Sequence, residues 1–337
     1  MKFSDVKLLL PSSGYMKTSE AGGRTVIDEI RDASYERNHQ SFVGDDRPEL
    51  HQGLDGNFFT SVEKESTNLF LNSDTLSTQG VEVTANPYTV SFEGAGTITF
   101  SGAHSGTLEG VEGKRVETTF TPSAGTLTCT VSGEVLKAQI EQSAYATLYI
   151  PTQGTPVTRL APEPVIQNAL PETGTVAGVV DMVSINGIIT GVWDTLGGTF
   201  TRKSRFFWQE QSPRFFLQIF GTDGGGGISF AYPSRGNNVR FKFAYFITYN
   251  NSDIRLKILD SNEIRGTTQS HTINDTSIRE FFLGFDFTNP KHSSRHENFY
   301  KDEIVRVNAT DAEIKAFFET LVKGTSMEMK ASEMTII

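Results

Sequence analysis

Cysteine, long apolar runs and charge are all scarce in this chain of 337 residues. The single cysteine, Cys129, excludes an internal disulfide, and we expect it to be a small buried hydrophobe on the apolar face of a strand. No apolar run reaches the ~20 residues that a helix needs to cross a bilayer, so we expect no membrane partner. Charged residues make up 21%, and the net charge of -10 repels phosphate backbones, so we expect no nucleic-acid partner.

Glycine and phenylalanine are plentiful instead, at 31 and 25 residues, which is typical of a strand-rich globular protein. The stretch from Asn86 to Arg159 alternates apolar and polar residues, the pattern of strands with one buried face. Leu127 and Cys129 lie on the apolar face of one such run. In another run, one face is expected to be buried and consists of Leu136, Ala138 and Ile140. The opposite face is expected to be exposed to solvent and consists of Lys137, Gln139 and Glu141. Gly, Ser, Pro and Asn separate the runs, so the pattern predicts an antiparallel sandwich or jelly roll.

Several motifs in this stretch occur in a fixed order. They are Asn68-Leu-Phe-Leu-Asn-Ser73, Gly94-Ala-Gly-Thr-Ile-Thr-Phe100, Gly125-Thr-Leu-Thr-Cys-Thr-Val-Ser-Gly133, Ala138-Gln-Ile-Glu141, Ala144-Tyr-Ala-Thr-Leu-Tyr-Ile-Pro-Thr152 and Pro156-Val-Thr-Arg159. This order resembles a module common in bacteriophage tail and virion proteins. That module resembles carbohydrate-binding jelly rolls and often precedes a concanavalin-like (laminin-G-like) domain. The resemblance covers 68–159 and implies a scaffold rather than a chemistry.

The predicted fold class is mainly β, with two antiparallel β-sandwich (jelly-roll) domains in tandem and a short N-terminal docking element. The predicted parts are a 1–60 arm, a 61–157 jelly roll, a 158–171 Pro-rich linker, a 172–323 concanavalin-like sandwich with a terminal helix, and a 324–337 tail. Within the arm, the spacing of Val26, Ile27 and Ile30 predicts a short helix over 24–36. The arm is expected to dock on a neighbouring virion subunit or, alternatively, to be a partly ordered tail or a lid.

The second sandwich shows its clearest alternation at Val239, Phe241, Phe243 and Tyr245, which are expected inside, with Arg240 and Lys242 outside. A further strand is expected at 303–307. A helix follows: Thr310 and Glu313 form a capping box, and an apolar stripe comes next at Ile314, Phe317, Phe318 and Leu321. Gly324 is expected to end the helix. A strand followed by this helix resembles the end of laminin-G-like domains.

No residue pattern predicts catalysis, a metal or a cofactor. Glycosidases need paired carboxylates, whereas Glu210 and Asp286 each lack an acidic neighbour on the same strand. His292 and His296 have a helical zinc spacing, but proline and serine around them favour an ordinary loop. The run 224–227 is four glycines without the Lys-Ser/Thr of a phosphate loop and is expected to be a hairpin tip.

Glycan-binding candidates lie in the loops of the second sandwich, because aromatic faces stack on sugars while amides and carboxylates order the hydroxyls. The candidate residues are Asp223, Tyr232, Asn237, Tyr249, Asn250, Asn251 and Asp253, with Ser234 beside them. We expect these tips to converge at one edge of the sandwich. The alternative is that Asn, Asp and Ser serve ordinary turns here.

Taken with the resemblance, these patterns predict a non-enzymatic phage structural protein located in the virion, either a tail fibre, a spike or a capsid decoration. It is expected to be a homo-oligomer, to contact other virion proteins through residues 1–60 and to attach to host-surface glycans, since many weak sites act together. The alternatives are a bacterial or prophage carbohydrate-binding module protein and, third, a capsule-depolymerising glycosidase.

Overall fold

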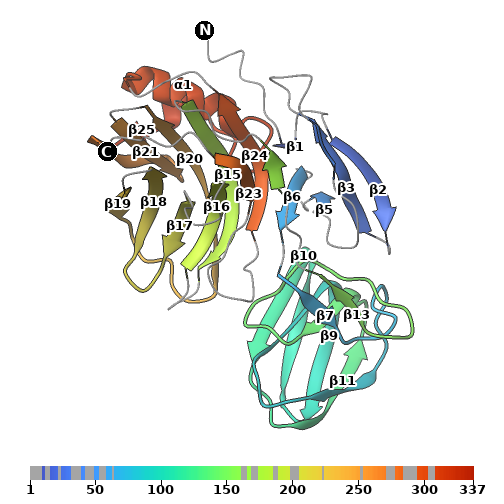
Figure 1. Ribbon diagram of the computed structural model, residues 1–337. Coiled ribbons are helices and arrows are strands. Elements are labelled where there is room, and N and C mark those ends of the chain that lie inside the picture. Colours follow the sequence, from blue (N-terminus) through green and yellow to red (C-terminus); the bar gives the residue numbers. More distant parts are fainter. Residues whose placement is uncertain are drawn as a thin grey trace. The chain divides into compact units, whose positions relative to one another are not determined.

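The computed structural model describes residues 10–11, 16–21, 24–31, 39–41, 49–52, 58–62, 64–160, 165–167, 174–184, 189–197, 205–221, 224–250, 253–270, 278–283, 294–302 and 308–337. The chain forms two compact units (Figure 1). Unit 1 comprises Met1–Ser19, Thr25–Val62 and Pro162–Ile337, and unit 2 comprises Glu20–Arg24 and Glu63–Ala161. The fold is mainly β with antiparallel sheets, as predicted. Among the described residues, no helix is long and apolar enough to span a membrane.

Unit 2 contains a five-stranded sheet and a short two-stranded one. The five strands are β8 (Gln79–Val83), β9 (Tyr88–Gly102), β10 (Gly106–Phe120), β11 (Gly125–Ser132) and β12 (Leu136–Glu141). The short sheet pairs β7 (Ser66–Asn68) with β13 (Val157–Arg159). The first half of β9 pairs with β12 and the second half with β11, while β10 follows β9 along its whole length.

The long β9–β10 hairpin is folded over on itself, and this fold makes the sandwich. Phe100 of β9 pairs with Gly106, and Tyr88 of β9 pairs with Phe120. Phe100 and Tyr88 lie near opposite ends of β9. The Phe100 and Phe120 rings nevertheless lie 5.2 Å apart. The two halves of β9 therefore face each other across one core, which holds Val90 and Phe92 from the first half and Ile98 and Phe100 from the second.

Glycines make the corner of this fold. Gly94 has φ +106°, and a Cβ on Gly96 would lie 2.5 Å from the Glu134 carbonyl oxygen. A Cβ on Gly110 would lie 2.1 Å from the Gly94 carbonyl oxygen. The strands approach closely here because these residues have no side chain. Glycine was expected to separate strand runs, but Gly94 lies at a bend within the single strand β9.

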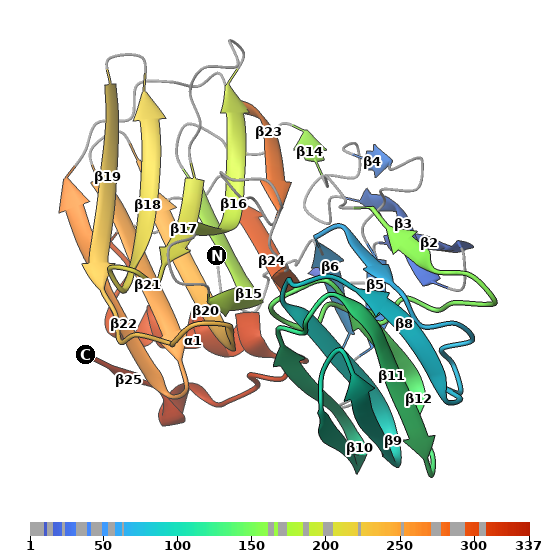
Figure 2. The ribbon, with the colours of Figure 1, turned by 90° about the horizontal axis from the view of Figure 1, so that it is seen from below.

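Unit 1 is built from a 12-stranded sheet and a 6-stranded sheet (Figure 2). The larger sheet contains β1 (Leu10–Pro11), β2 (Met16–Ala21), β3 (Arg24–Arg31), β4 (His39–Ser41), β5 (Glu49–Gln52), β6 (Phe58–Val62), β24 (Ser294–Asp302), β15 (Gly174–Ser184), β20 (Val239–Tyr249), β21 (Asp253–Asp260), β22 (Glu263–Ser270) and β25 (Thr335–Ile336). The smaller contains β14 (Val165–Gln167), β23 (Ile278–Leu283), β16 (Ile189–Gly197), β17 (Arg205–Gln209), β18 (Arg214–Gly221) and β19 (Gly224–Ala231).

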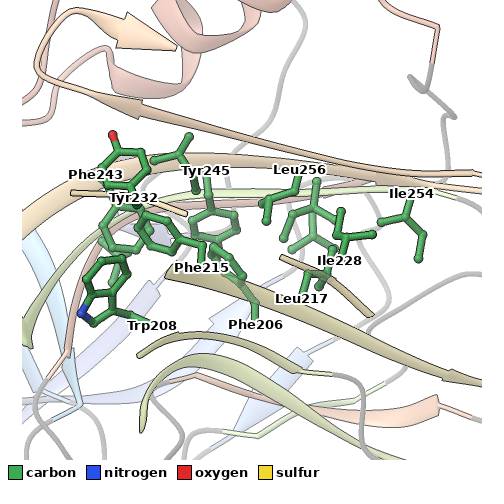
Figure 3. Close-up of a cluster of buried hydrophobic side chains, with 14 of the residues drawn as sticks. Phe206, Trp208, Phe215, Leu217, Ile228, Tyr232, Phe243, Tyr245, Ile254 and Leu256 are labelled. Atoms are coloured by element: carbon green, nitrogen blue, oxygen red, sulfur yellow. The ribbon is translucent and has the colours of Figure 1, made fainter. Parts of the chain in front are cut away.

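The core of unit 1 lies between these sheets, and a second cluster lies on the outer face of the larger one. Side chains from β17 and β18, such as Phe206 and Phe215, pack against Phe243 and Tyr245 of β20 in an aromatic-rich cluster (Figure 3). Phe246 points to the opposite face and packs on the helix α1 (Asp311–Val322). From Phe243 onward, β20 is therefore buried on both faces. Val239, predicted inside, is 42% exposed at the start of the strand.

The predicted terminal helix is confirmed as α1. Thr310 accepts a hydrogen bond from the Glu313 N–H, and the Glu313 carboxylate accepts one from the Thr310 N–H, so the capping box is complete. The predicted stripe from Ile314 to Leu321 is buried against β15 and β20. Gly324, with φ +73°, follows the helix. The stripe fixes α1 on the larger sheet because each of its apolar residues loses contact with water there.

The helix predicted over 24–36 is wrong, because Arg24–Arg31 form the strand β3. Thr25, Val26, Ile27 and Ile30 are β-branched, and such residues suit a strand once a partner strand is present. The partners are there: β5 pairs with both β3 and β6, and β6 pairs with β24 of the second sandwich. Residues expected to form a separate arm thus extend the sheet of unit 1.

Strands also form in the segments that were predicted to be a linker and a tail. The predicted linker contains the end of β13 and all of β14, and β25 of the predicted tail pairs in parallel with β22 of the same chain. The strand expected at 303–307 lies outside the described residues. The first-sandwich alternation is confirmed at Leu127 and Cys129, which are both fully buried. It fails at Gln139 and Glu141, which were expected to face water and are 0% exposed.

Candidate functional site

The two tyrosines predicted to bind glycan are part of the core of unit 1. Tyr249 and Tyr232 are 4% and 6% exposed and belong to the aromatic cluster shown in Figure 3, where Tyr232 is labelled. Tyr232 packs edge-on against Trp208 and Phe215. Neither ring offers a free face to a sugar, so the expectation of exposed aromatic platforms at these two positions is wrong.

The polar candidates near Tyr249 shape a hairpin. The Asn250 side chain accepts a hydrogen bond from the Asp253 N–H at 2.7 Å, and Asp253 accepts one from Ser270 Oγ at 3.0 Å. The Asn250 N–H donates to the Asp253 carbonyl at 3.0 Å. These bonds belong to the β20–β21 connection, as the alternative of ordinary turn residues predicts. Asp223 and Asn251 lie outside the described residues, as do Asp286 and His292.

The structure does not bring the two predicted tips together. Tyr232, Ser234 and Asn237 lie before β20 begins at Val239, whereas Asn250 and Asp253 lie beyond its end at Tyr249. A strand of 11 residues is roughly 35 Å long at ~3.3 Å per residue. The expected convergence at one edge therefore fails, because the tips lie at opposite ends of the same strand.

Glu210 holds the loop between β19 and β20. Its carboxylate accepts hydrogen bonds from Ser184 Oγ at 2.8 Å, from Ser234 Oγ, and from the N–H groups of Arg235 and Gly236 at 3.1 Å each. Burial acts to raise the pKa of Glu210, but these four donors stabilise the charged form and leave the pKa below its ordinary value. Each oxygen of the Glu210 carboxylate therefore accepts hydrogen bonds from groups of the protein itself.

Beside this loop, the Arg235 guanidinium stacks on aromatic rings. It lies 4.9 Å from the Tyr232 ring centroid and 5.4 Å from that of Phe241, and it pairs with Asp260. Tyr232 donates to the same Asp260 carboxylate at 3.3 Å. Burial, followed by the charge of Asp260, raises the pKa of Tyr232. The cluster fastens Tyr232 to the core and leaves its hydroxyl hydrogen-bonded within the protein.

Unit 2 contains a buried polar network that the sequence analysis missed. Glu141 accepts hydrogen bonds from Ser66 Oγ, Gln139 Nε2 and both the N–H and hydroxyl of Thr147, at 2.5 to 2.8 Å. Asn68 donates to the Ala138 and Ile150 carbonyls and accepts from the Phe70 and Ile140 N–H groups. Every oxygen and donor named here is satisfied inside the protein, which is the condition for burying such groups.

The network continues to the surface through Ser73 and Tyr149. Ser73 Oγ accepts from the Thr152 N–H at 2.9 Å and lies 2.7 Å from Tyr149 Oη, which donates to Asp74 Oδ1 at 2.8 Å. Burial raises the pKa of Tyr149; the bond to Ser73 lowers it, Asp74 raises it and the charge of Arg115 lowers it. Ser73, Tyr149 and Thr152 lie in the motifs of the first sandwich, yet the contacts join segments about 75 positions apart, which no local pattern reveals.

Within the described part of the chain, no group of three or more His, Cys, Asp or Glu side chains could hold a metal ion.

Comparisons with known proteins give structural likenesses only. No protein-family model matches the chain, and no curated protein matches it. Among solved structures, the CBM40 of a Ruminococcus gnavus IT-sialidase bound to α2,3-sialyllactose is 16% identical, covers 41% of this chain and 79% of its own, and has a TM-score of 0.33.

Two further structures match at similar levels. The receptor-binding domain of botulinum neurotoxin type G is 14% identical, with 44% of this chain and 38% of that chain covered and a TM-score of 0.32. The enzymatically active domain of bacteriophage CBA120 tailspike protein 2 is 13% identical, with 50% and 28% covered and a TM-score of 0.34. The chain thus spans well under half the length of these two proteins. Likenesses this distant carry no argument about function.

Proposed function

We propose that this chain is a non-enzymatic structural protein of a phage particle, a tail fibre, spike or capsid decoration, that displays β-sandwiches for attachment to host-surface glycans. The observation that carries the proposal is the polar network of unit 2. Four of its members, Asn68, Gln139, Glu141 and Tyr149, come from the motifs that resemble the virion module. The resemblance therefore involves the residues that determine the fold of this unit, not a stretch of surface.

The proposal assigns no catalytic residue. The carboxylate of Glu210 is occupied by four donors of its own chain, and this favours a structural role. Incubating the full chain with host polysaccharide should release no reducing ends. Release by the wild type that disappears in Glu210→Gln, with folding intact, would contradict this part of the proposal.

The proposed virion contact lies in residues 1–60, and a truncation is a poor test of it. The strands β2 to β6 extend the sheet of unit 1, so their removal would uncover β24 and disturb folding. Cross-linking of intact particles avoids this problem because the segment contains Lys2, Lys7 and Lys17. We expect cross-links from these lysines to other virion proteins. Cross-links confined to lysines elsewhere in the chain would place the attachment surface there.

A mass-spectrometric inventory of purified particles tests the proposal as a whole. We expect the chain in the particles, and we expect the isolated chain to be a defined homo-oligomer. Absence from particles would remove the virion role. If the absent chain still bound glycans, the alternative of a bacterial or prophage carbohydrate-binding module protein would replace it.

A further inference from the structure

Unit 2 has a polar surface cluster that contains none of the predicted site residues. We name it the Tyr149 ledge and define it by Asn72, Asp74, Lys137 and Tyr149. The Gly154 N–H donates to Asn72 Oδ1 at 3.1 Å, Tyr149 Oη donates to Asp74 Oδ1 at 2.8 Å, and the Lys137 N–H donates to the Asp74 carbonyl at 3.1 Å. Three segments distant in sequence thus meet at one place on the surface of the unit.

The ledge stands on the buried network and is held firmly. Ser73, between Asn72 and Asp74, is 0% exposed and is bonded to Thr152 and Tyr149, so its two neighbours are left on the exposed side. Asn72 and Lys137 have φ values of +53° and +45°. Residues other than glycine hold this conformation at a cost of about 1 to 2 kcal/mol, which the surrounding bonds must offset.

The ledge keeps polar atoms available to a ligand. Asn72 and Asp74 are exposed, and within the described residues Asp74 Oδ2 and Asn72 Nδ2 make no hydrogen bond. Tyr149 is partly exposed, and its hydroxyl lies 2.8 Å from Asp74 Oδ1. An acceptor, a donor and an aromatic ring therefore lie together, the combination that recognises a sugar hydroxyl pair and the C–H groups beside it.

The charges at the ledge balance, and this indicates the class of ligand. Lys137 Nζ pairs with Glu93 at 3.1 Å, and the charges of Asp74 and Arg115 act in opposite directions on the pKa of the Tyr149 hydroxyl. Two positive and two negative side chains leave no net charge to attract an acidic sugar. The binding of a neutral sugar does not depend on such an attraction, so the charge balance does not weaken it.

We propose that the Tyr149 ledge of the first sandwich is a binding site for a neutral glycan. The Tyr149 ring packs on the sugar, Asp74 Oδ2 accepts from one hydroxyl, and Asn72 Nδ2 donates to another. This inference rests on the proposed attachment function and places its site in unit 2, in contrast to the loops of the second sandwich favoured by sequence.

The test is binding of the labelled full chain to an array of neutral and acidic oligosaccharides and to whole host cells. We expect binding to neutral glycans. Asp74→Asn should weaken it at least about tenfold, because a hydrogen bond to a charged group is replaced by a weaker one. Tyr149→Ala should abolish binding, and Tyr149→Phe, which keeps the ring, should retain most of it. Glu109→Gln, an exposed carboxylate on β10, is the matched control and should bind as wild type does.

Each outcome has a distinct meaning. Equal binding by wild type, Asp74→Asn and Tyr149→Ala, all with unchanged thermal unfolding, would overturn the ledge and leave the attachment function in place. Binding to acidic glycans alone would overturn the assigned ligand class. A wild-type chain that binds neither the array nor host cells would overturn both the ledge and the glycan part of the proposed function.

Discussion

Replacing Gly96 by alanine should destabilise unit 2 selectively, because its Cβ would enter the corner of the folded hairpin. The new carbon would lie 2.5 Å from the Glu134 carbonyl oxygen and within 2.8 Å of the Glu134 nitrogen and carbonyl carbon. All three contacts are backbone atoms, so no side-chain rotation relieves them. Overpacking costs about 1 to 3 kcal/mol, and parting the strands also weakens the hydrogen bond from the Gly96 N–H to Glu134, worth about 1 kcal/mol. We expect a loss of about 3 kcal/mol in unfolding free energy.

For a domain of this size, 1 kcal/mol corresponds to about 4 to 8 °C in Tm, so Gly96→Ala should lower the Tm of unit 2 by about 12 to 24 °C. Scanning calorimetry of the full chain measures this. Both tryptophans, Trp193 and Trp208, belong to unit 1, so tryptophan fluorescence follows the unfolding of unit 1. A calorimetric transition without a fluorescence change is therefore that of unit 2.

Gly113→Ala is the control for the Gly96 experiment. Gly113 has φ +67°, but a Cβ added there would meet no atom within 4 Å, so this variant should lose only about 1 kcal/mol, the cost of left-handed backbone. A Tm shift for Gly96→Ala no larger than that of Gly113→Ala would refute the steric account of the corner.

Three further variants test buried polar groups. Tyr245 is fully buried and its hydroxyl has no hydrogen-bond partner among the described residues, so Tyr245→Phe should stabilise unit 1 by up to about 1 kcal/mol, measured by denaturant unfolding. A clear loss of stability would contradict this. The lowered pKa of Glu210 means that its stabilisation is complete above the ordinary carboxyl pKa of about 4.3 and is lost as pH falls through the lower folded value. Glu210→Gln should flatten the acid limb of unit 1 stability; an unaltered limb would exclude this group. Glu141→Ala removes the acceptor of four buried hydrogen bonds and should cost unit 2 about 3 kcal/mol by calorimetry, and a neutral result would contradict the network.

The sequence carried the local part of this fold. The alternation at Leu127 and Cys129 predicted a half-buried strand, and the Thr310–Glu313 box predicted the start of α1; both were confirmed because neighbouring residues determine them. The spacing of Val26, Ile27 and Ile30 fitted a helix equally well. The segment forms a strand because β5 pairs with it, β6 pairs with β5, and β24, near the other end of the chain, pairs with β6. No local window of sequence contains that information.

The candidate site was predictable only as a list of residue types. Asn250 and Asp253 were correctly polar, but their bonds close a turn, and Tyr249 was read as a platform although its register in β20 buries it. Gln139 and Glu141 were placed on a wet face because alternation along a strand does not indicate what covers that face. Their cover is the segment around Thr147, held by side chains that no propensity describes.

The pairing of β6 with β24 has a consequence for how the protein is made. Unit 1 contains strands from both sides of unit 2, so unit 2 is an insertion whose entering and leaving strands, β7 and β13, pair directly with each other. During synthesis, unit 2 can close as soon as β13 has left the ribosome, whereas β6 must wait for β24 until most of the chain has been translated. In that interval, the early strands present an unpaired sheet edge, which is where binding of a chaperone or mispairing with another nascent copy would act.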